Sequence, residues 1–360
     1  MGKTVILRAD GSFRIGLGHL MRLIAIGQEL RIRGVKSIFI LRKTEKGVLG
    51  VIKKYGFCYK LIPLHASYEE ETKIILKNAA CLKAKIIIID LSYYETLKNI
   101  KIFFSLVREL KEAGKFIVLI DGGTKEDCLI AHRGISVDVV VIPYFGAKRR
   151  QYFRGRNSMF LLGAEYFVFR QEFRSIAAQR RKVAKVGKRI LVTMGGSDPY
   201  GLTRMVVEAL LKLKRNFSAK VIIGSFFDIK EKKKIRSLVQ NKKSISFIEN
   251  CTCLAKMMFE SDVAIISNGL TKYEVAVTGT PSLLISPRGV LRTLGKQHGK
   301  EMPHVLICQK EGVNVLRLKD QIESLLSDYA LRCRLSNNGT KIIDEKGVQR
   351  IIEALPKEML

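Results

Sequence analysis

The sequence predicts an α/β protein made of two consecutive domains, each built on a mostly parallel β-sheet. Short apolar runs alternate with helix-like segments along nearly the whole chain, which is typical of strands buried on both faces. A strand, a glycine-rich loop and a helix open the chain, and the same order starts again near residue 189. With 360 residues, of which 47% are hydrophobic, the chain is long enough to form two cores.

Strands and helices are predicted to alternate through the first half. The apolar run 4–9 leads through a loop into a helix at 19–33, which stops at Gly34. Further strands are predicted at residues 37–41, 58–62, 86–89, 116–120 and 137–142, and further helices at 47–55, 70–82 and 97–113.

The alternation resumes after a polar, basic segment. Strands are predicted at residues 189–194, 220–223, 244–247, 263–266 and 282–285, and helices at 228–239, 252–261 and 273–278. We therefore expect a first domain at 1–171, a linker at 172–188, a second domain at 189–345, and a C-terminal helix within 346–360 that packs back on the first domain.

The composition excludes several classes of protein. No apolar run reaches the roughly 18 to 20 residues that a helix needs to cross a bilayer, and residues 1–10 contain no signal-peptide core, so we expect a soluble, cytoplasmic protein. The seven cysteines are scattered without a CxxC pair. This pattern supports neither a zinc site nor a disulfide framework, and we expect no bound metal.

The net charge of +31 raises the question of nucleic acid. The basic residues are spread over both halves rather than gathered in a tail, tryptophan is absent and aromatic residues make up only 8%, which does not favour base stacking. A solvated basic surface is the preferred interpretation, and contact with an anionic membrane surface is a second one. We expect no specific nucleic-acid partner, and the oligomeric state is left open.

The first glycine-rich loop is a candidate anion site. Gly16 and Gly18 follow the first strand, and His19 and Arg22 lie at the start of the first helix, where free backbone N–H groups favour anions. Met21 stands where a dinucleotide fingerprint has its third glycine, so a redox nucleotide is not expected. The alternative is a tight turn with an incidental histidine.

A second glycine-rich loop, with Gly195, Gly196 and Ser197, follows the first strand of the second domain. Ligands bind beyond the carboxyl ends of parallel strands, so two such domains indicate one ligand in a cleft between them. Neither loop has the lysine of a P-loop, which argues against an ordinary nucleoside triphosphatase.

A third loop, which contains Asn268, follows another buried strand and leads to Glu274 in the next helix. A carboxylate there can accept hydrogen bonds from ribose hydroxyls. Taken alone, Glu274 is better explained as an ordinary solvated or helix-capping residue than as a ribose ligand.

Five motifs together resemble the nucleotide-sugar hydrolases of pseudaminic acid biosynthesis, which are related to spore-coat polysaccharide proteins and MurG-like glycosyltransferases. The hydrolases act on UDP-2,4-diacetamido-2,4,6-trideoxy-β-L-altropyranose. The motifs occur in the family order, at residues 8–10, 16–22, 163–173, 194–199 and 266–274.

The resemblance implies a GT-B fold with two Rossmann-like domains, UDP held mostly by the second, and a reaction without metal or cofactor. It implies that His19 is the general base that activates water, and that Glu274 binds ribose. The other residues that it implies in substrate binding are Arg8, Asp10, Gly16, Gly18, Arg22, Gly195, Gly196, Ser197, Asn268 and Gln297.

The sequence departs from the family where Lys296 replaces the usual asparagine before Gln297, and where extra residues follow. The resemblance implies hydrolysis of a UDP-sugar for nonulosonic acid synthesis, and this is the expected function. Two alternatives remain. One is a glycosyltransferase that uses the same donor, and the other is a basic nucleic-acid-binding protein.

Overall fold

The computed structural model divides into two compact units. Residues 1–171 and 346–360 form the first unit, and residues 172–345 form the second. The structure describes residues 3–12, 15–44, 46–92, 96, 99–122, 128–131, 135–147, 157–224, 226–240, 242–249, 251–285, 302–308 and 314–360.

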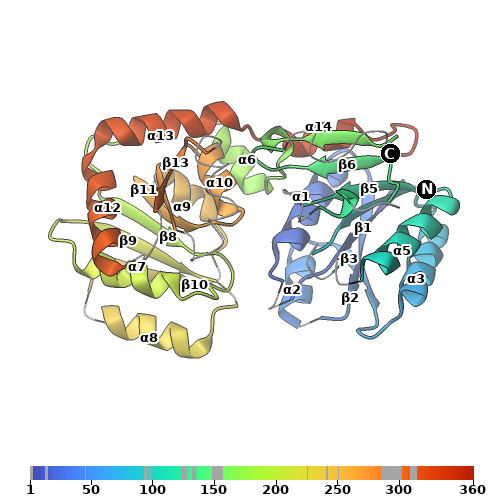
Figure 1. Cartoon of the computed structure of the whole chain (residues 1–360), viewed down its shortest axis with the longest axis horizontal. Coiled ribbons are helices and arrows are strands. Elements are labelled where there is room, and N and C mark those ends of the chain that lie inside the picture. Colours follow the sequence, from blue (N-terminus) through green and yellow to red (C-terminus); the bar gives the residue numbers. More distant parts are fainter. Residues whose placement is uncertain are drawn as a thin grey trace. The chain divides into compact units, whose positions relative to one another are not determined.

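The first unit contains a seven-stranded sheet in the order β3-β2-β1-β4-β5-β6-β7, in which every pairing is parallel (Figure 1). The strands are β1 (Thr4–Ala9), β2 (Lys36–Arg42), β3 (Cys58–Ile62), β4 (Ile86–Asp90), β5 (Phe116–Ile120), β6 (Val139–Ile142) and β7 (Met159–Leu162). Its helices include α1 (Gly18–Ile32), α2 (Lys46–Lys54), α3 (Tyr68–Cys81) and α5 (Ile100–Glu112), and its short 3-10 helices are η1 (Leu129–Ala131) and η3 (Ala164–Tyr166).

The central strands of this sheet are apolar because helices cover both faces. All six residues of β1 and all five of β4 are buried. Helix α3 begins with a capping box, in which the Ser67 hydroxyl accepts from the N–H of Glu70 and the Glu70 carboxylate accepts from the N–H of Ser67. Parallel registry sets Ala9 beside Asp90, so the carboxyl ends of β1 and β4 meet at one edge.

The second unit contains a six-stranded parallel sheet in the order β10-β9-β8-β11-β12-β13. The strands are β8 (Arg189–Thr193), β9 (Ser218–Ile223), β10 (Ile245–Glu249), β11 (Val263–Ser267), β12 (Ser282–Ile285) and β13 (Val305–Cys308). Its helices among the described residues include α6 (Gln171–Ala177), which starts at the boundary, α7 (Leu202–Leu211), α8 (Ile229–Val239), α9 (Leu254–Glu260), α10 (Thr271–Val277), α12 (Val315–Ser327) and α13 (Tyr329–Ile342). The prediction of two Rossmann-like parallel sheets is confirmed.

Residues 172–188, which the sequence suggests as a linker, are part of the second unit. Helix α6 occupies the start of this segment. The Arg181 guanidinium donates to the carbonyl oxygens of Phe259 and Ser261, and the buried Arg332 guanidinium donates to those of Ala184 and Lys185. The polar composition of the segment therefore reflects hydrogen bonds that attach it to the second unit.

The chain returns to the first unit at its C-terminus. Helix α14 (Gly347–Glu353) lies against α1 and η3, and Arg350 donates to the carbonyl oxygen of Glu165. A Cβ atom at position 347 would lie 2.2 Å from the carbonyl oxygen of Phe167, so glycine permits this close approach.

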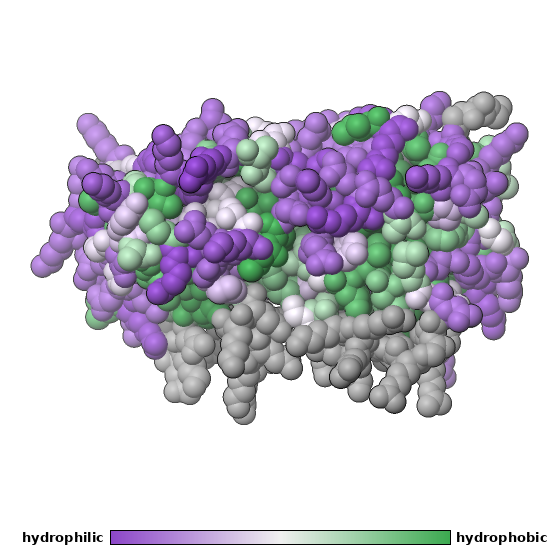
Figure 2. All heavy atoms as spheres, turned by 90° about the horizontal axis from the view of Figure 1, so that it is seen from above, coloured by the Kyte–Doolittle hydropathy of each residue, from purple (hydrophilic) through white to green (hydrophobic). Residues whose placement is uncertain are grey.

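Hydrophilic side chains cover most of the described surface on the face in Figure 2, with smaller hydrophobic areas between them. Within the described residues, none of the helices combines the length and the apolar character that a membrane crossing requires.

Candidate functional site

In each sheet the strand order reverses beside the first strand of the unit. β1 lies between β2 and β4, and β8 lies between β9 and β11. In open parallel sheets the crevice at this reversal, beyond the carboxyl ends of the strands, is where ligands bind. The predicted site residues follow the strands next to these two points, with two exceptions. Arg8 lies within β1, and Gln297 lies outside the described residues.

The loop after β1 delivers His19 to the carboxyl end of β4. Gly16 has a φ of +75°, a backbone conformation that favours glycine, and it forms an antiparallel bridge with Ser12. The turn closes the loop just before α1 begins at Gly18, so that His19 lies in the first turn of the helix.

His19 and Asp90 form a close pair. The Nδ1 atom of His19 lies 2.7 Å from Oδ1 of Asp90, whose side chain is fully buried, while the imidazole is 19% exposed. The NH2 group of Arg22 also lies 3.0 Å from Nδ1, but it donates to Oδ1 of Asp90 at the shorter distance of 2.8 Å. In the tautomer with the proton on Nδ1, that proton is donated to the ionised carboxylate, which leaves the lone pair of Nε2 as an acceptor. This is the arrangement of a general base whose tautomer is set by a buried carboxylate.

Arg22, one turn further along α1, clamps Asp90. Its Nε atom donates to Oδ2 of Asp90 at 2.7 Å, and its NH1 group donates to the Tyr144 hydroxyl at 2.7 Å. Burial alone would raise the pKa of Asp90, but the charges of Arg22 and His19 outweigh it and lower the pKa. Arg22, predicted to bind substrate, is thus engaged in keeping Asp90 ionised and in place.

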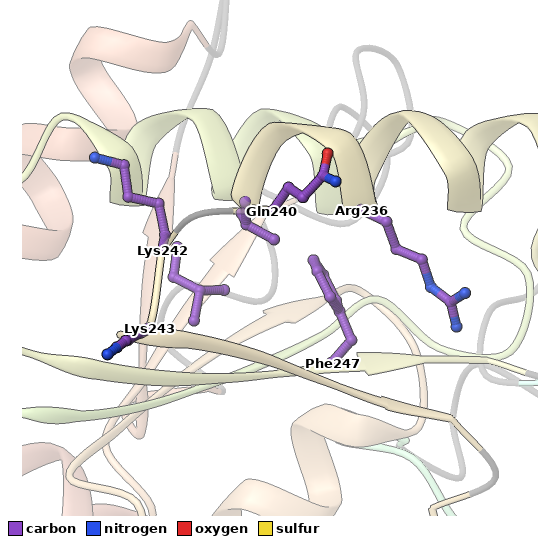
Figure 3. A pocket seen from close by; sticks show the side chains of 7 residues that line it. Arg236, Gln240, Lys242, Lys243 and Phe247 are labelled. Carbon is purple, nitrogen blue, oxygen red and sulfur yellow. The ribbon is translucent and has the colours of Figure 1, made fainter.

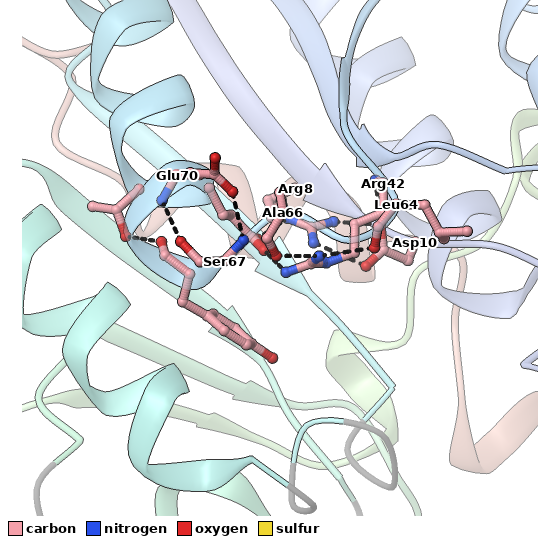
Figure 4. Close-up of polar contacts among 10 residues, drawn as sticks. Arg8, Asp10, Arg42, Leu64, Ala66, Ser67 and Glu70 are labelled. Atoms are coloured by element: carbon pink, nitrogen blue, oxygen red, sulfur yellow. Dashed lines mark hydrogen bonds and ion pairs between the residues drawn. The ribbon is translucent and has the colours of Figure 1, made fainter.

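Arg8 and Asp10, also predicted to bind substrate, belong to a second ionic network (Figure 4). The Arg8 guanidinium is 1% exposed and donates to both Asp10 oxygens at 2.6 and 2.9 Å and to Glu71 Oε1 at 2.7 Å. Arg42 donates from its backbone N–H to Asp10 and from its side chain to Glu71. Burial would lower the pKa of Arg8, yet the two carboxylates raise it. The network joins β1, β2 and α3.

The glycine-rich loop of the second unit exposes its backbone. Gly195 has a φ of +86°, and both Gly195 and Gly196 are exposed, with Ser197 half-buried. A Cβ atom on Gly224 would lie 2.2 Å from the carbonyl oxygen of Gly196. A glycine at position 224 therefore allows the segment after β9 to pack directly against the loop after β8. The Asp198 carboxylate caps α7 by accepting from the N–H groups of Leu202 and Thr203.

The loop after β11 carries Asn268, and helix α10, which follows the loop, carries Lys272 and Glu274. The Lys272 ammonium donates to Oδ1 of Asn268 at 3.0 Å, and no carboxylate of the described residues pairs with it. Burial lowers the pKa of Lys272 to about 8. His304, whose pKa burial lowers to about 4, lies with Nε2 at 2.9 Å from the Lys272 carbonyl oxygen. Glu274 is half-buried.

The Lys272→Met substitution is expected to stabilise the protein at pH 7 by about 2 to 3 kcal/mol, because it removes a buried charge that lacks a counter-ion. The pKa of Lys272 is about 10.5 in the unfolded chain and about 8 in the folded protein. The free energy of unfolding of the wild type therefore rises as the pH increases from 8 to 10.5. Urea unfolding at pH 7 and 10 measures this, and the advantage of the variant should fall below about 1 kcal/mol at the higher pH. An equal advantage at both pH values would contradict a buried ammonium.

Two residues at these strand ends were not anticipated as functional, namely Asp90 and Lys272. Asp90 ends an apolar strand, a position where a lone carboxylate is itself a signal, whereas the environment of Lys272 depends on packing. Among the described residues, no group of three or more His, Cys, Asp or Glu side chains is arranged to hold a metal ion.

Two curated proteins are similar to the chain in sequence, while no family model matches it. Spore coat polysaccharide biosynthesis protein SpsG of Bacillus subtilis is 23% identical over 351 residues, which cover 96% of each protein. The uncharacterized protein MJ1062 of Methanocaldococcus jannaschii is 28% identical over 287 residues, which cover 78% of this chain and 55% of MJ1062. The chain thus spans about half the length of MJ1062 and nearly all of SpsG.

Solved structures resemble the whole chain. MurG of Acinetobacter baumannii matches it with a TM-score of 0.68 and 14% identity, over 98% of both chains. The chain has the GT-B fold. HepE of Anabaena in complex with UDP-glucose matches with a TM-score of 0.60 and 12% identity, over 98% of this chain and 100% of HepE. At such identities the likeness establishes the GT-B fold alone.

Proposed function

We propose that this GT-B chain is a hydrolase that cleaves a UDP-sugar into UDP and a free sugar. The observation that carries the proposal is the His19–Asp90 pair at the carboxyl end of β4, because a partly exposed imidazole with its tautomer set by a buried carboxylate is suited to general base catalysis. The similarity to a polysaccharide biosynthesis protein supports a sugar substrate.

In the proposed reaction, Nε2 of His19 takes a proton from a water molecule as the water oxygen bonds to the anomeric carbon. The bond between that carbon and the phosphate oxygen breaks, and UDP leaves with the electron pair. Asp90 stabilises the imidazolium as it forms, and Arg22 keeps Asp90 ionised through two hydrogen bonds. The glycines Gly16 and Gly18 shape the loop that presents the base.

The second unit supplies the proposed nucleotide contacts. Backbone N–H groups of the exposed Gly195, Gly196 and Ser197 loop are suited to a diphosphate, and the Lys272 ammonium beside Asn268 adds a positive charge. The Glu274 carboxylate is proposed to accept hydrogen bonds from the ribose hydroxyls. Arg8 and Asp10 then act indirectly, by holding the strand that leads to the His19 loop.

The proposed substrate is a UDP-linked 2,4-diacetamido-2,4,6-trideoxy sugar of nonulosonic acid synthesis, on the basis of the five motifs that resemble the hydrolases. Incubation of UDP-2,4-diacetamido-2,4,6-trideoxy-β-L-altropyranose in ¹⁸O-labelled water tests this. Attack at the anomeric carbon incorporates label into the sugar and none into UDP. Label in UDP, or no UDP release, would contradict the proposal.

A glycosyltransferase is the second candidate, because the same His19–Asp90 pair can remove a proton from a sugar hydroxyl as readily as from water. UDP release that requires a glycolipid acceptor and yields no free sugar would establish transfer instead of hydrolysis.

The Glu274→Ala substitution is expected to weaken UDP binding by about 1 to 3 kcal/mol, the range for lost hydrogen bonds to a charged group. Calorimetric titration with UDP measures the change, and titration with inorganic diphosphate is the control that should not respond. The carboxylate is half-buried and lies in the first turn of a short helix, so the substitution should change the unfolding temperature by only a few degrees. Unchanged UDP affinity would remove Glu274 from the nucleotide site.

A further inference from the structure

A groove of about 660 Å³ lies in the second unit between helix α8 and the edge strand β10 (Figure 3). Its apolar part consists of the buried Val239 and Ile245 and the half-buried Phe247, and basic side chains surround it. Arg236 and Gln240 extend from the helix side, while Lys242 and Lys243 follow the helix and precede β10. The proposed hydrolysis uses none of these residues.

One face of α8 borders this groove. Residues 229, 233, 236 and 240 recur at helical spacing, so they share a face, and two of them, Arg236 and Gln240, line the groove. Ile229 on this face is 70% exposed, which is unusual for an isoleucine. Lys233, which lies between Ile229 and Arg236 on this face, is also exposed. The face therefore presents an aliphatic side chain together with positive charge.

Most of the positive charge around the groove is not neutralised within the described part of the chain. Arg236 pairs with Glu249 at 2.7 Å, and the Asp228 carboxylate accepts from the N–H groups at the start of α8. Lys233, Lys242 and Lys243 are exposed and have no described carboxylate within ion-pair distance. The groove and the bordering face of α8 thus offer three ammonium groups beside apolar surface, two in the groove and one on the helix face, that no described carboxylate pairs with.

We propose that the groove and the bordering face of α8 form a binding site for an anionic lipid surface. The three ammonium groups meet lipid phosphates, and Ile229 and Phe247 contact the region where headgroups and acyl chains meet. A nucleic acid would use the same charges, but its phosphates gain nothing from an exposed isoleucine. Stacking of single-stranded bases calls for exposed aromatic rings, whereas Phe247 is half-buried. The proposal concerns location at a membrane and does not depend on the hydrolysis proposed above.

The test is sedimentation of the full chain with vesicles of phosphatidylglycerol, of phosphatidylcholine, and with duplex DNA as a competing polyanion. Wild-type protein is expected to bind the anionic vesicles and not the neutral ones. A basic side chain near an anionic surface strengthens binding by about fivefold, so the combined Lys233→Gln, Lys242→Gln and Lys243→Gln variant should bind about 100-fold more weakly. Ile229→Ser should weaken vesicle binding at 0.3 M salt and leave DNA binding unchanged.

A matched control removes the same charge elsewhere in the second unit, at the exposed Lys188, Lys212 and Lys214. The control variant should lose less than tenfold in vesicle binding. Equal losses in the two triple variants would show that only net charge matters and would overturn the proposal. Loss of DNA binding without loss of vesicle binding, or unchanged vesicle binding by Ile229→Ser, would overturn it as well. UDP binding by the groove variants, measured by calorimetry, should match the wild type.

Discussion

The His19→Asn variant is expected to bind UDP with wild-type affinity and to lose about 10²- to 10⁴-fold in kcat, the contribution of a positioned general base. Asparagine has a similar size and can keep a hydrogen bond to Asp90, but its amide cannot accept a proton from water. Turnover is measured by UDP release and binding by calorimetry. Because His19 is 19% exposed, the substitution leaves no buried cavity, and the unfolding temperature should stay within a few degrees of the wild type.

Two further variants show whether the loss belongs to the pair. His65→Asn changes an exposed histidine in the same unit and should retain full turnover. Asp90→Asn should lower kcat, because the amide no longer sets the His19 tautomer, and it should also lower stability, because Arg22 loses a buried counter-ion. Wild-type turnover by His19→Asn would make the histidine structural and the hydrolytic mechanism wrong.

The parallel sheets were predictable because their strands are short, continuous apolar runs. Thr4–Ala9, Cys58–Ile62 and Phe116–Ile120 were predicted with the bounds that the structure has. Charged residues border the first and the third, and a proline follows the second. The second sheet repeats the pattern, and the prediction located four of its six strands near β8, β9, β10 and β11 and a fifth at β12. Helix starts differ from the predicted ones by up to three residues, since helix ends are the least well defined by periodicity.

The sequence interpretation missed one edge strand of each sheet. β7 and β13 are strands of four residues at sheet edges, a length at which periodicity cannot separate a strand from a loop. The helices α12 and α13 were also not predicted, because the motifs end near Gln297 and the residues beyond looked like an extension. Buried Leu318, Ile322 and Leu325 at helical spacing show that α12 is part of the second core.

The sequence predicts which loops and strand ends contribute residues to the candidate site, but it does not predict which side chains pair with one another. His19 was found because it lies in a glycine-rich loop after a strand, but its partner Asp90 is 71 residues away and depends on the pairing of β1 with β4. The same limit applies to Arg8 and Arg22. The motifs identify Arg8 and Arg22 as charged side chains, whereas only the fold shows that Arg8 donates to the buried Glu71 and Arg22 to the buried Asp90.

Glu71 connects the buried network of the first unit, and its removal is expected to have the largest effect on stability. The side chain is 1% exposed and accepts from Arg8 at 2.7 Å and from Arg42 at 2.6 Å. Loss of one partner from a buried ion pair leaves an uncompensated charge, which typically costs about 3 to 5 kcal/mol. Arg8 retains Asp10 as a partner, but its Nε–H group loses Glu71 Oε1 as an acceptor.

Glu71→Ala should therefore lower the free energy of unfolding by about 3 to 5 kcal/mol in urea titrations at pH 7, while Glu69→Ala, an exposed change in the same turn of α3, should cost less than about 1 kcal/mol. Adding Arg8→Met to Glu71→Ala should recover part of the loss, because the unpaired buried cation is then gone. UDP affinity should be the same in all variants at a urea concentration where they remain folded. If Glu71→Ala instead retains wild-type stability and loses UDP affinity or turnover, the network serves ligand binding, and Arg8 and Asp10 contact the substrate as their motif predicts.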